Sequence, residues 1–279
     1  MEYSDIGPGH YTDLSNDDYH RGPGTSSSHL PYADLSPLHY WTDIIDPDRE
    51  EVEKTPALIL GDAIHKAILE PDLFHERFIE RPEGINGSTK EGKLRLSELH
   101  AEAAGRIILK SGDFQMVSDV RDAVHTHPVA KGLLVGGAAE ESYFTIDRET
   151  GELVKCRPDY RHHNGFVVDV KSTEDASPNA FGRSAANYSY DISAAWYSDI
   201  LDEHYGAPPP HFVFLAIEKK KPHAIGVYFV QEDAMAAGRV EARARFHRLL
   251  EWRRANNWTD YGITPQPLRL PGWARRAGA

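Results

Sequence analysis

The chain has 279 residues, of which 40% are hydrophobic and 27% are charged, a balance ordinary for a globular protein with a sizeable core. Its formal net charge of −12 argues against a protein coated in nucleic acid, because phosphate binding depends on Lys and Arg, but a protein that grips DNA only inside a cleft is not excluded. The single cysteine, Cys156, excludes an internal disulfide, a four-cysteine zinc site and a cysteine-bound iron–sulfur cluster. No apolar run approaches the ~20 residues of a membrane helix, and the N-terminus lacks a signal-peptide pattern, so we expect a cytoplasmic protein.

The first third of the chain predicts an irregular arm followed by helices. Residues 1–54 are rich in Pro, Gly, Ser and Asp, with short helical stretches at "SNDDYH" and "SSSHLPYADL", and we expect them to pack on the body. A helix then begins at Pro56, with Thr55 as its N-cap, and ends before Pro71. After the loop "EGINGSTKEG", two helices are predicted over 93–110 and 114–126, the second ending before a His-Pro pair.

The second half alternates strands with helices. Three segments rich in β-branched and aromatic residues, "EESYFTID", "ELVKCRPDY" and "FVVDVK", predict a three-strand meander. Helical composition returns over 177–205, and two strands, "HFVFLAIE" and "AIGVYFV", precede an Arg-rich helix over 231–256. This order predicts an α/β fold with a mixed central sheet flanked by helices. We expect a main domain over 55–256 between the arm and an irregular tail over 257–279.

Two carboxylates and an ammonium gather in the segment 155–173. Side chains alternate along a strand, so Asp169 and Lys171 share one face while the intervening valines face the core. Asp159 joins them if a three-residue loop ending at Gly165 pairs 159 with 169, or if a bulge lies near Pro158, because a strict two-residue turn would put it on the opposite face. Neighbouring carboxylates resist ionisation unless a cation lies between them. The set therefore suits a hard divalent ion and phosphodiester hydrolysis, and an exposed Asp–Lys surface pair is the alternative.

Other candidate residues are a histidine and a group of lysines. His65 lies on the first long helix, one turn beyond Gly61, and a neutral imidazole is a competent metal ligand, although a lone histidine on a helix flank is more often structural. The pair His162-His163 lies in a turn and is assigned to solvent. Lys219, Lys220 and Lys221, like the arginines of the last helix, are on charge alone best interpreted as solvated.

The ordered set of motifs resembles a known family. GxxxH in a helix is followed by the PD of "KCRPDY", the DxK of "VVDVKSTEDASPNAF" and the helix "YDISAAWY". This order resembles the PD-(D/E)xK nuclease superfamily, and more narrowly the RecE-type exonuclease domain (exonuclease VIII) of phages and prophages. The likeness covers nearly the whole chain, since "LSNDDYH", "GTSSSHL" and "LSPLHYW" resemble that family's arm and "LRLPGWA" its tail.

The resemblance implies a Mg²⁺-dependent exonuclease, with Mn²⁺ as a substitute, that degrades one strand of double-stranded DNA from 5′ to 3′. The resulting 3′ single-stranded tails would serve recombination by single-strand annealing, beside an annealing recombinase. It also implies a homo-oligomeric ring that threads DNA ends through its channel, in a bacterium or a phage-infected host cell. Lys219, Lys220 and Lys221 would be candidates for the DNA-binding lining of such a ring.

The resemblance also assigns roles to residues of the site. Asp159 and Asp169 would be metal ligands, the carbonyl of Val170 and His65 would help to complete the sites, and Lys171 would position the nucleophilic water.

One departure from the family pattern lies in the helix "YDISAAWY". Ser193 stands where the family usually has Gln, while Tyr197 keeps its place one helical turn on, so both face the same way. Because Ser is too short to reach a phosphate as Gln would, we expect weaker positioning of substrate or metal.

Two alternatives stay open at this point. One is a structure-selective endonuclease of the same superfamily, because the metal chemistry does not dictate a need for DNA ends. The other is a catalytically weakened DNA-binding or assembly protein, for which the Ser193 departure leaves room. A nucleotide-binding enzyme is disfavoured, since the sequence contains no GxGxxG or Walker-type loop.

Overall fold

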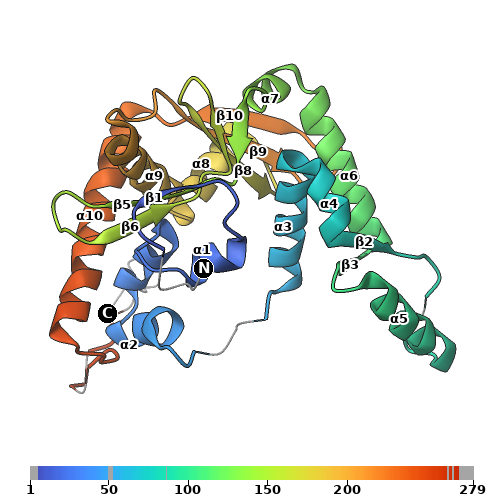
Figure 1. The fold of residues 1–279 in the computed structure, drawn as a ribbon, viewed down its shortest axis with the longest axis horizontal. Coiled ribbons are helices and arrows are strands. Elements are labelled where there is room, and N and C mark those ends of the chain that lie inside the picture. The colour runs from blue at the N-terminus through green and yellow to red at the C-terminus, as the bar shows by residue number, and fades with distance from the viewer. Residues whose placement is uncertain (1–5, 50–52, 86, 263, 266, 270–279) are drawn as a thin grey trace, which may run out of the picture. The chain divides into compact units, whose positions relative to one another are not determined.

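The computed structural model describes residues 6–49, 53–85, 87–262, 264–265 and 267–269 (Figure 1). The chain forms two compact units: unit 1 comprises Met1–Ser28 and Glu51–Arg243, and unit 2 comprises His29–Glu50 and Ala244–Ala279. Within these described residues, every helix is too short or too polar to cross a membrane. Residues 270–274 of the tail segment "LRLPGWA" lie outside the described residues.

The elements alternate along the chain, with helices concentrated in its first half. The helices are α1 (Asn16–Arg21), η2 (Ser27–Asp34), α2 (Pro37–Tyr40), η3 (Trp41–Ile45), α3 (Pro56–Leu69), α4 (Pro71–Arg77), α5 (Lys90–Ala103), α6 (Ser111–Thr126), α7 (Pro128–Leu133), α8 (Pro178–Asn187), α9 (Tyr190–Tyr205) and α10 (Glu232–Ala255). The strands are β1 (Gly9–Tyr11), β2 (Phe78–Arg81), β3 (Ile107–Lys110), β4 (Gly137–Ala139), β5 (Ser142–Ile146), β6 (Leu153–Cys156), β7 (Tyr160–His162), β8 (Val167–Thr173), β9 (Phe212–Glu218) and β10 (Ile225–Phe229).

A mixed five-stranded sheet in the order β10-β9-β8-β7-β4 forms the centre of unit 1. β8 and β9 are parallel and the other neighbours are antiparallel, which confirms the predicted mixed sheet. A three-stranded sheet, β1-β5-β6, and the parallel pair β2-β3 complete the strand pairing of the described residues.

Helices cover both faces of the central sheet. On one face, Val168 of β8 belongs to a core cluster with Ile64 of α3, and Figure 1 shows α3 and α6 beside each other next to the sheet. On the other face, the rings of Phe181 in α8 and Tyr190 in α9 lie 6.0 and 5.4 Å from the ring of Phe214 in β9. A parallel strand buried on both faces reads as a continuous hydrophobic run, which explains the composition of β9, whereas β8 carries Asp169 and Lys171 on one of its faces.

Helix α3 forms as its sequence predicts. Pro56 occupies the first turn, and the Thr55 side chain accepts a hydrogen bond from the Leu58 N–H at 3.3 Å, as an N-cap does. Its core-facing side chains are Ala63, Ile64, Ala67 and Ile68. Since these residues fix the rotation of the helix, His65 lies on its flank with 26% of its side chain exposed.

The hairpin between β7 and β8 adopts the three-residue loop. Tyr160 pairs with Val168 and Arg161 with Val167, a register that aligns 159 with 169. The Gly165 N–H donates to the His162 carbonyl at 2.8 Å, and Gly165 has φ +88°, a left-handed conformation that suits glycine. The loop geometry that puts both carboxylates on one face is therefore present.

The predicted three-strand meander is wrong. "ELVKCRPDY" forms two strands in different sheets, because β6 pairs with β5 whereas β7 pairs with β4 and β8. The break falls at Arg157 and Pro158, and a proline cannot donate to a strand ladder. Pro158-Asp159 therefore lies at a crossing between two sheets rather than inside one strand.

The predicted helix over 93–110 is also wrong at its end. α5 ends at Ala103, and Gly105 follows with φ +90°. Ile107–Lys110 then forms β3, which pairs in parallel with the unpredicted strand β2. A glycine followed by β-branched residues is the signal for a helix end and a strand, and it was present here.

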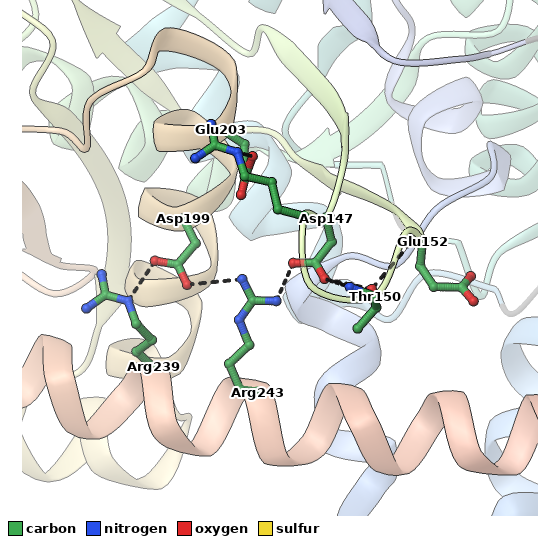
Figure 2. Close-up of polar contacts among 8 residues, drawn as sticks. Asp147, Thr150, Glu152, Asp199, Glu203, Arg239 and Arg243 are labelled. Atoms are coloured by element: carbon green, nitrogen blue, oxygen red, sulfur yellow. Dashed lines mark hydrogen bonds and ion pairs between the residues drawn. The ribbon is translucent and has the colours of Figure 1, made fainter.

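The arginines of α10 are in part solvated, as charge alone suggested, since Arg248 and Arg254 are exposed, but several of them also have partners in the fold. In unit 1, Arg239 donates to Asp199 at 2.7 Å and Arg243 pairs with Asp147, as Figure 2 shows. In unit 2, considered by itself, Arg245 pairs with Asp34 at 2.6 Å and Arg248 donates to a backbone carbonyl at 2.9 Å.

Candidate active site

A cleft of about 870 Å³ in unit 1 brings together most of the predicted site residues. Its walls come from the N-terminal segment, α3, α4, the end of β4, β8 and α9. The predicted residues that line it are His65, Asp159, Val170, Lys171 and Tyr197. Residues more than 180 positions apart in the chain therefore share one concave surface, which is the usual form of a ligand site.

Three side chains in the cleft are arranged to hold a metal ion. His65, Glu140 and Asp159 each offer one ligand atom, and these atoms lie within 4.8 Å of one another. The Nδ1 of His65 is 3.5 Å from an oxygen of Asp159. Among the described residues this is the one such cluster of histidine, cysteine and carboxylate groups. Two of its members were predicted from the sequence, and Glu140 was not.

Asp159 is held in place by the strand beside it. Its Oδ2 accepts a hydrogen bond from the Val170 N–H at 2.6 Å, which replaces a ladder bond just before β7 begins. In an extended strand the N–H and C=O of one residue point to the same edge. The Val170 carbonyl therefore points to the edge where Asp159 lies, while the valine side chain stays in the core.

Glu140 reaches the cluster through long-range pairing. It follows β4, whose pairing with β7 brings it to Asp159, and its N–H donates to the Asp159 carbonyl at 3.1 Å. Its φ of +55° is uncommon for a residue other than glycine. Burial, and then the negative charge of Asp159, raise the pKa of the Glu140 carboxyl to about 8. In the sequence, the stretch "GGAAEE" offers no periodicity that would have singled this residue out.

Asp169 and Lys171 form an ion pair next to the cluster, with Asp169 buried and Lys171 facing the cleft. The cluster of three possible ligands does not include Asp169, whose predicted role as a metal ligand stays a prediction. Burial raises the pKa of Asp169 to about 6, with Lys171 opposing the effect and Asp159 adding to it. Burial also disfavours the charged ammonium of Lys171, but Asp169 and Asp159 outweigh it and raise the pKa of this lysine. Lys171 is therefore a fixed positive charge at neutral pH.

Tyr197 lines the cleft, whereas Ser193 does not. Burial, followed by the negative charges of Asp169 and Asp159, raises the pKa of the Tyr197 phenol well above its ordinary value. The phenol is therefore a hydrogen-bond donor at neutral pH. Ser193 is half-buried in α9, one turn before Tyr197, and its short side chain does not reach the cleft wall. The role that the family resemblance gives to this position stays a prediction.

Two buried cations, unpredicted from the sequence, hold the N-terminal segment against the site. The Lys155 ammonium donates to the carbonyls of Tyr19 and Gly22, both at 2.6 Å. The Arg157 guanidinium donates to the Ser142 hydroxyl at 2.7 Å and to the carbonyl of Leu14, a cleft residue. Because buried charges need partners, these contacts fix one wall of the cleft.

The lysines predicted to bind DNA lie outside this cleft. Lys219 and Lys220 pair with Glu174 at 2.8 and 2.9 Å, and Lys221 pairs with Asp119 at 3.0 Å. The cations that line the cleft are instead Lys54, Lys66, Arg77, Arg157 and Lys171. Any role of Lys219, Lys220 and Lys221 on DNA stays a prediction.

The donor set of the cluster fits a divalent cation. Two carboxylates and one imidazole are ligands suited to Mg²⁺ or Mn²⁺, the imidazole favouring Mn²⁺ of the two. The raised pKa of Glu140 indicates that this carboxylate lacks enough positive charge nearby. A bound cation would supply that charge.

Comparisons with known proteins identify the family and the fold of the chain. A family model described as a PDDEXK-like domain of unknown function (DUF3799) matches residues 36–264. A solved structure from Eubacterium rectale, described as "Putative exonuclease", is similar in fold, with a TM-score of 0.62, 14% identity, and coverage of 92% of this chain and 94% of that chain. Another solved structure, described as SSO0001, is 14% identical with a TM-score of 0.29 over 67% of this chain and 85% of that chain, a likeness too low to carry an argument. No curated protein sequence matches the chain.

Proposed function

The chain belongs to the PDDEXK-like family DUF3799, and from this premise we propose that it is a divalent-metal-dependent deoxyribonuclease that degrades double-stranded DNA from its ends. The observation that carries the proposal is the convergence of His65, Glu140 and Asp159, beside the Asp169–Lys171 pair, in one cleft. The likeness to a Eubacterium rectale structure described as an exonuclease supports the same reading.

The residues of the cleft have different roles in phosphodiester hydrolysis. Asp159, fixed by the Val170 N–H, and His65 and Glu140 would hold the cation. Mg²⁺ bound there would supply Lewis-acid activation of the phosphate and of water. Lys171 carries its charge on the same face, where it can orient water or stabilise negative charge that develops on the phosphate.

Basic residues line the cleft and a neighbouring cavity, although the protein as a whole is acidic. A second cavity of about 420 Å³ shares Lys66, Leu73 and Arg77 with the cleft and adds Arg106. Basic residues thus extend from Lys66 in α3, past Arg77 in α4, to Arg106 after α5, with Lys66 paired to Glu70 and Arg77 paired to Asp62. This arrangement supports DNA as the substrate, because Lys and Arg provide most of the affinity for phosphates.

The finer parts of the proposal rest on the family resemblance. They are 5′-to-3′ polarity, the production of 3′ tails for recombination, assembly into a homo-oligomeric ring, and cooperation with an annealing recombinase. Sedimentation of the purified protein tests the ring, and a single-strand annealing protein added to the digest tests the cooperation.

Digestion of linear duplex labelled at either the 5′ or the 3′ end, with closed-circular DNA alongside, tests activity and polarity together. We expect Mg²⁺-dependent release of the 5′ label as mononucleotide, earlier than the 3′ label, and intact circles. Asp159→Asn should abolish release, whereas Asp72→Asn, an exposed first-turn residue of α4, should not. Cleavage of the circles would establish an endonuclease instead, and no cleavage with any divalent cation would overturn the proposal.

A further inference from the structure

An aromatic pair beside Lys171 has no part in the mechanism above. Tyr188 caps the end of α8 and Tyr190 begins α9, and their rings stack with centroids 5.8 Å apart and planes 22° from parallel. Tyr190 lines the cleft, and the Lys171 Nζ lies 5.1 Å from the centre of its ring. Packing on Phe214 explains Tyr190 as part of the core. It does not explain Tyr188, which is 70% exposed.

The backbone between the two rings is held in an unfavourable conformation. Ser189, the N-cap residue of α9, has φ +56°, a left-handed conformation that costs a non-glycine residue free energy. The turn it makes ends α8, starts α9 and places Tyr188 and Tyr190 in contact. The stack is thus fixed by both adjoining helices, and Tyr188 is its solvent-exposed end.

An exposed ring at the end of a stack, next to a cation in a strand-binding cleft, has the chemistry that recognises a nucleobase. Bases stack on aromatic side chains whatever their sequence, while the neighbouring cations contact the phosphates. A nucleotide can use both groups at once, because its base stacks on the ring and its phosphate pairs with the cation. The apolar surface of Tyr188 is also continuous with the cleft through Tyr190.

We propose that Tyr188 and Tyr190 form a base-stacking platform that holds an unpaired nucleobase of the DNA strand beside the cleft. This inference rests on the proposed nuclease function and adds a binding subsite to it. The platform would favour DNA ends that are frayed or tailed over fully paired ends, because a paired base is already stacked on its neighbours.

The test compares Tyr188→Leu, which still covers Tyr190 but has no aromatic face, with Tyr188→Phe, which keeps the face. Phe229→Leu is a matched control, because Phe229 is an aromatic residue of similar exposure, 63%, on β10, a strand that contributes no residue to the cleft. The probe is a duplex with a short unpaired tail that carries 2-aminopurine, whose fluorescence falls on stacking. Binding is measured with Ca²⁺, which takes the same oxygen ligands as Mg²⁺, and digestion is measured with Mg²⁺.

We expect Tyr188→Leu to weaken tail binding about tenfold or more, to lose the quenching, and to raise KM with kcat little changed. Tyr188→Phe and Phe229→Leu should behave as wild type. If wild type cleaves DNA but Tyr188→Leu binds and quenches as wild type does, the platform is overturned and the nuclease proposal stands. If wild type neither cleaves nor binds DNA, the nuclease proposal fails and the platform fails with it.

Discussion

The protonation of Glu140 depends on the charge of its neighbour Asp159. Burial and the charge of Asp159 together favour the neutral form of Glu140, and a bound cation would reverse that preference. His65, the third member of the cluster, adds a neutral donor but no negative charge when it is unprotonated. The site therefore holds its full negative charge only when a cation is present.

Replacing Glu140 by Gln keeps the size of the side chain and removes its charge. We expect Mg²⁺-dependent cleavage to fall by about 10²-fold or more, the scale of losing one electrostatic contributor to a transition state. The adjacent Glu141 is the matched control, because it pairs with His10 at 3.0 Å and does not line the cleft. Initial rates at several Mg²⁺ concentrations measure both variants. Equal losses in Glu140→Gln and Glu141→Gln would refute the assignment.

Ser193 allows a gain-of-function test. If a longer amide helps to position substrate or metal as the family resemblance implies, Ser193→Gln should raise the cleavage rate several-fold, an effect of about 1 kcal/mol. The measurement is the initial rate on 5′-labelled duplex at fixed Mg²⁺. No gain would mean that this position is unimportant in this protein.

The site residues that were predicted are placed by contacts between nearby parts of the sequence, whereas those that were missed are placed by contacts between distant parts. Asp159 and Lys171 could be predicted because a hairpin, an alternation of side chains and a glycine in the loop place them within 13 positions of each other. Glu140 could not, because its placement depends on the β4–β7 pairing and on a left-handed backbone that the sequence does not signal. Lys155 and Arg157 were missed because their partners in the N-terminal segment lie more than 130 positions away.

At the scale of elements, the loop between β7 and β8 decides the register of the site. Three residues with Gly165 at φ +88° align Asp159 with Asp169, and a one-residue slip would move Asp159 to the other face. The loop therefore links a single backbone angle to the position of a candidate metal ligand.

Gly165→Ala should lower the free energy of unfolding by about 1 kcal/mol, because alanine resists the left-handed conformation. Cleavage should fall as well if the strain is relieved by shifting the loop. Gly182→Ala is the control: this residue lies inside α8 with open space around it, and alanine should be neutral or stabilising there. Urea unfolding of the three proteins measures these changes. Equal stability of wild type and Gly165→Ala would contradict the claim that the left-handed conformation of this residue requires glycine.

The elements with local signals were predicted, and those that depend on distant pairing were not. The cap of α3, the ends of α6 and α9, and the strands β9 and β10 follow from short patterns. The division of "ELVKCRPDY" between two sheets depends on which distant strands are free to pair. A proline in the run was the local indication that a single strand would not form.

Across the molecule, much of the basic charge serves the fold rather than a ligand. In unit 1, Figure 2 shows Arg239 and Arg243 of α10 reaching Asp199 on α9 and Asp147 in the β5–β6 turn. Asp147 also accepts hydrogen bonds from the N–H and the hydroxyl of Thr150, at 2.9 and 2.6 Å. Burial disfavours the Asp147 carboxylate, but these bonds and Arg243 outweigh it and lower its pKa.

This network predicts a defined dependence of stability on pH. Because the folded-state pKa of Asp147 lies below the ordinary pKa of an aspartate, its ionised form stabilises the fold at and above about pH 4, and that contribution is lost as the pH falls through the folded-state pKa. The free energy of unfolding of wild type should exceed that of Asp147→Asn by about 1–3 kcal/mol at pH 7, and this difference should shrink toward pH 3. Urea unfolding across this range measures it. A difference in the free energy of unfolding that stays constant with pH would show that the charge of Asp147 does not cause the stabilisation.

The cation site itself is tested most directly by Mn²⁺ titration followed by electron paramagnetic resonance, which detects the free ion without reference to activity. Wild type should remove Mn²⁺ from solution, and His65→Ala, Glu140→Gln and Asp159→Asn should each weaken that binding, while Glu141→Gln should not. A triple variant of His65, Glu140 and Asp159 that binds Mn²⁺ as tightly as wild type would contradict the claim that these three side chains hold the ion.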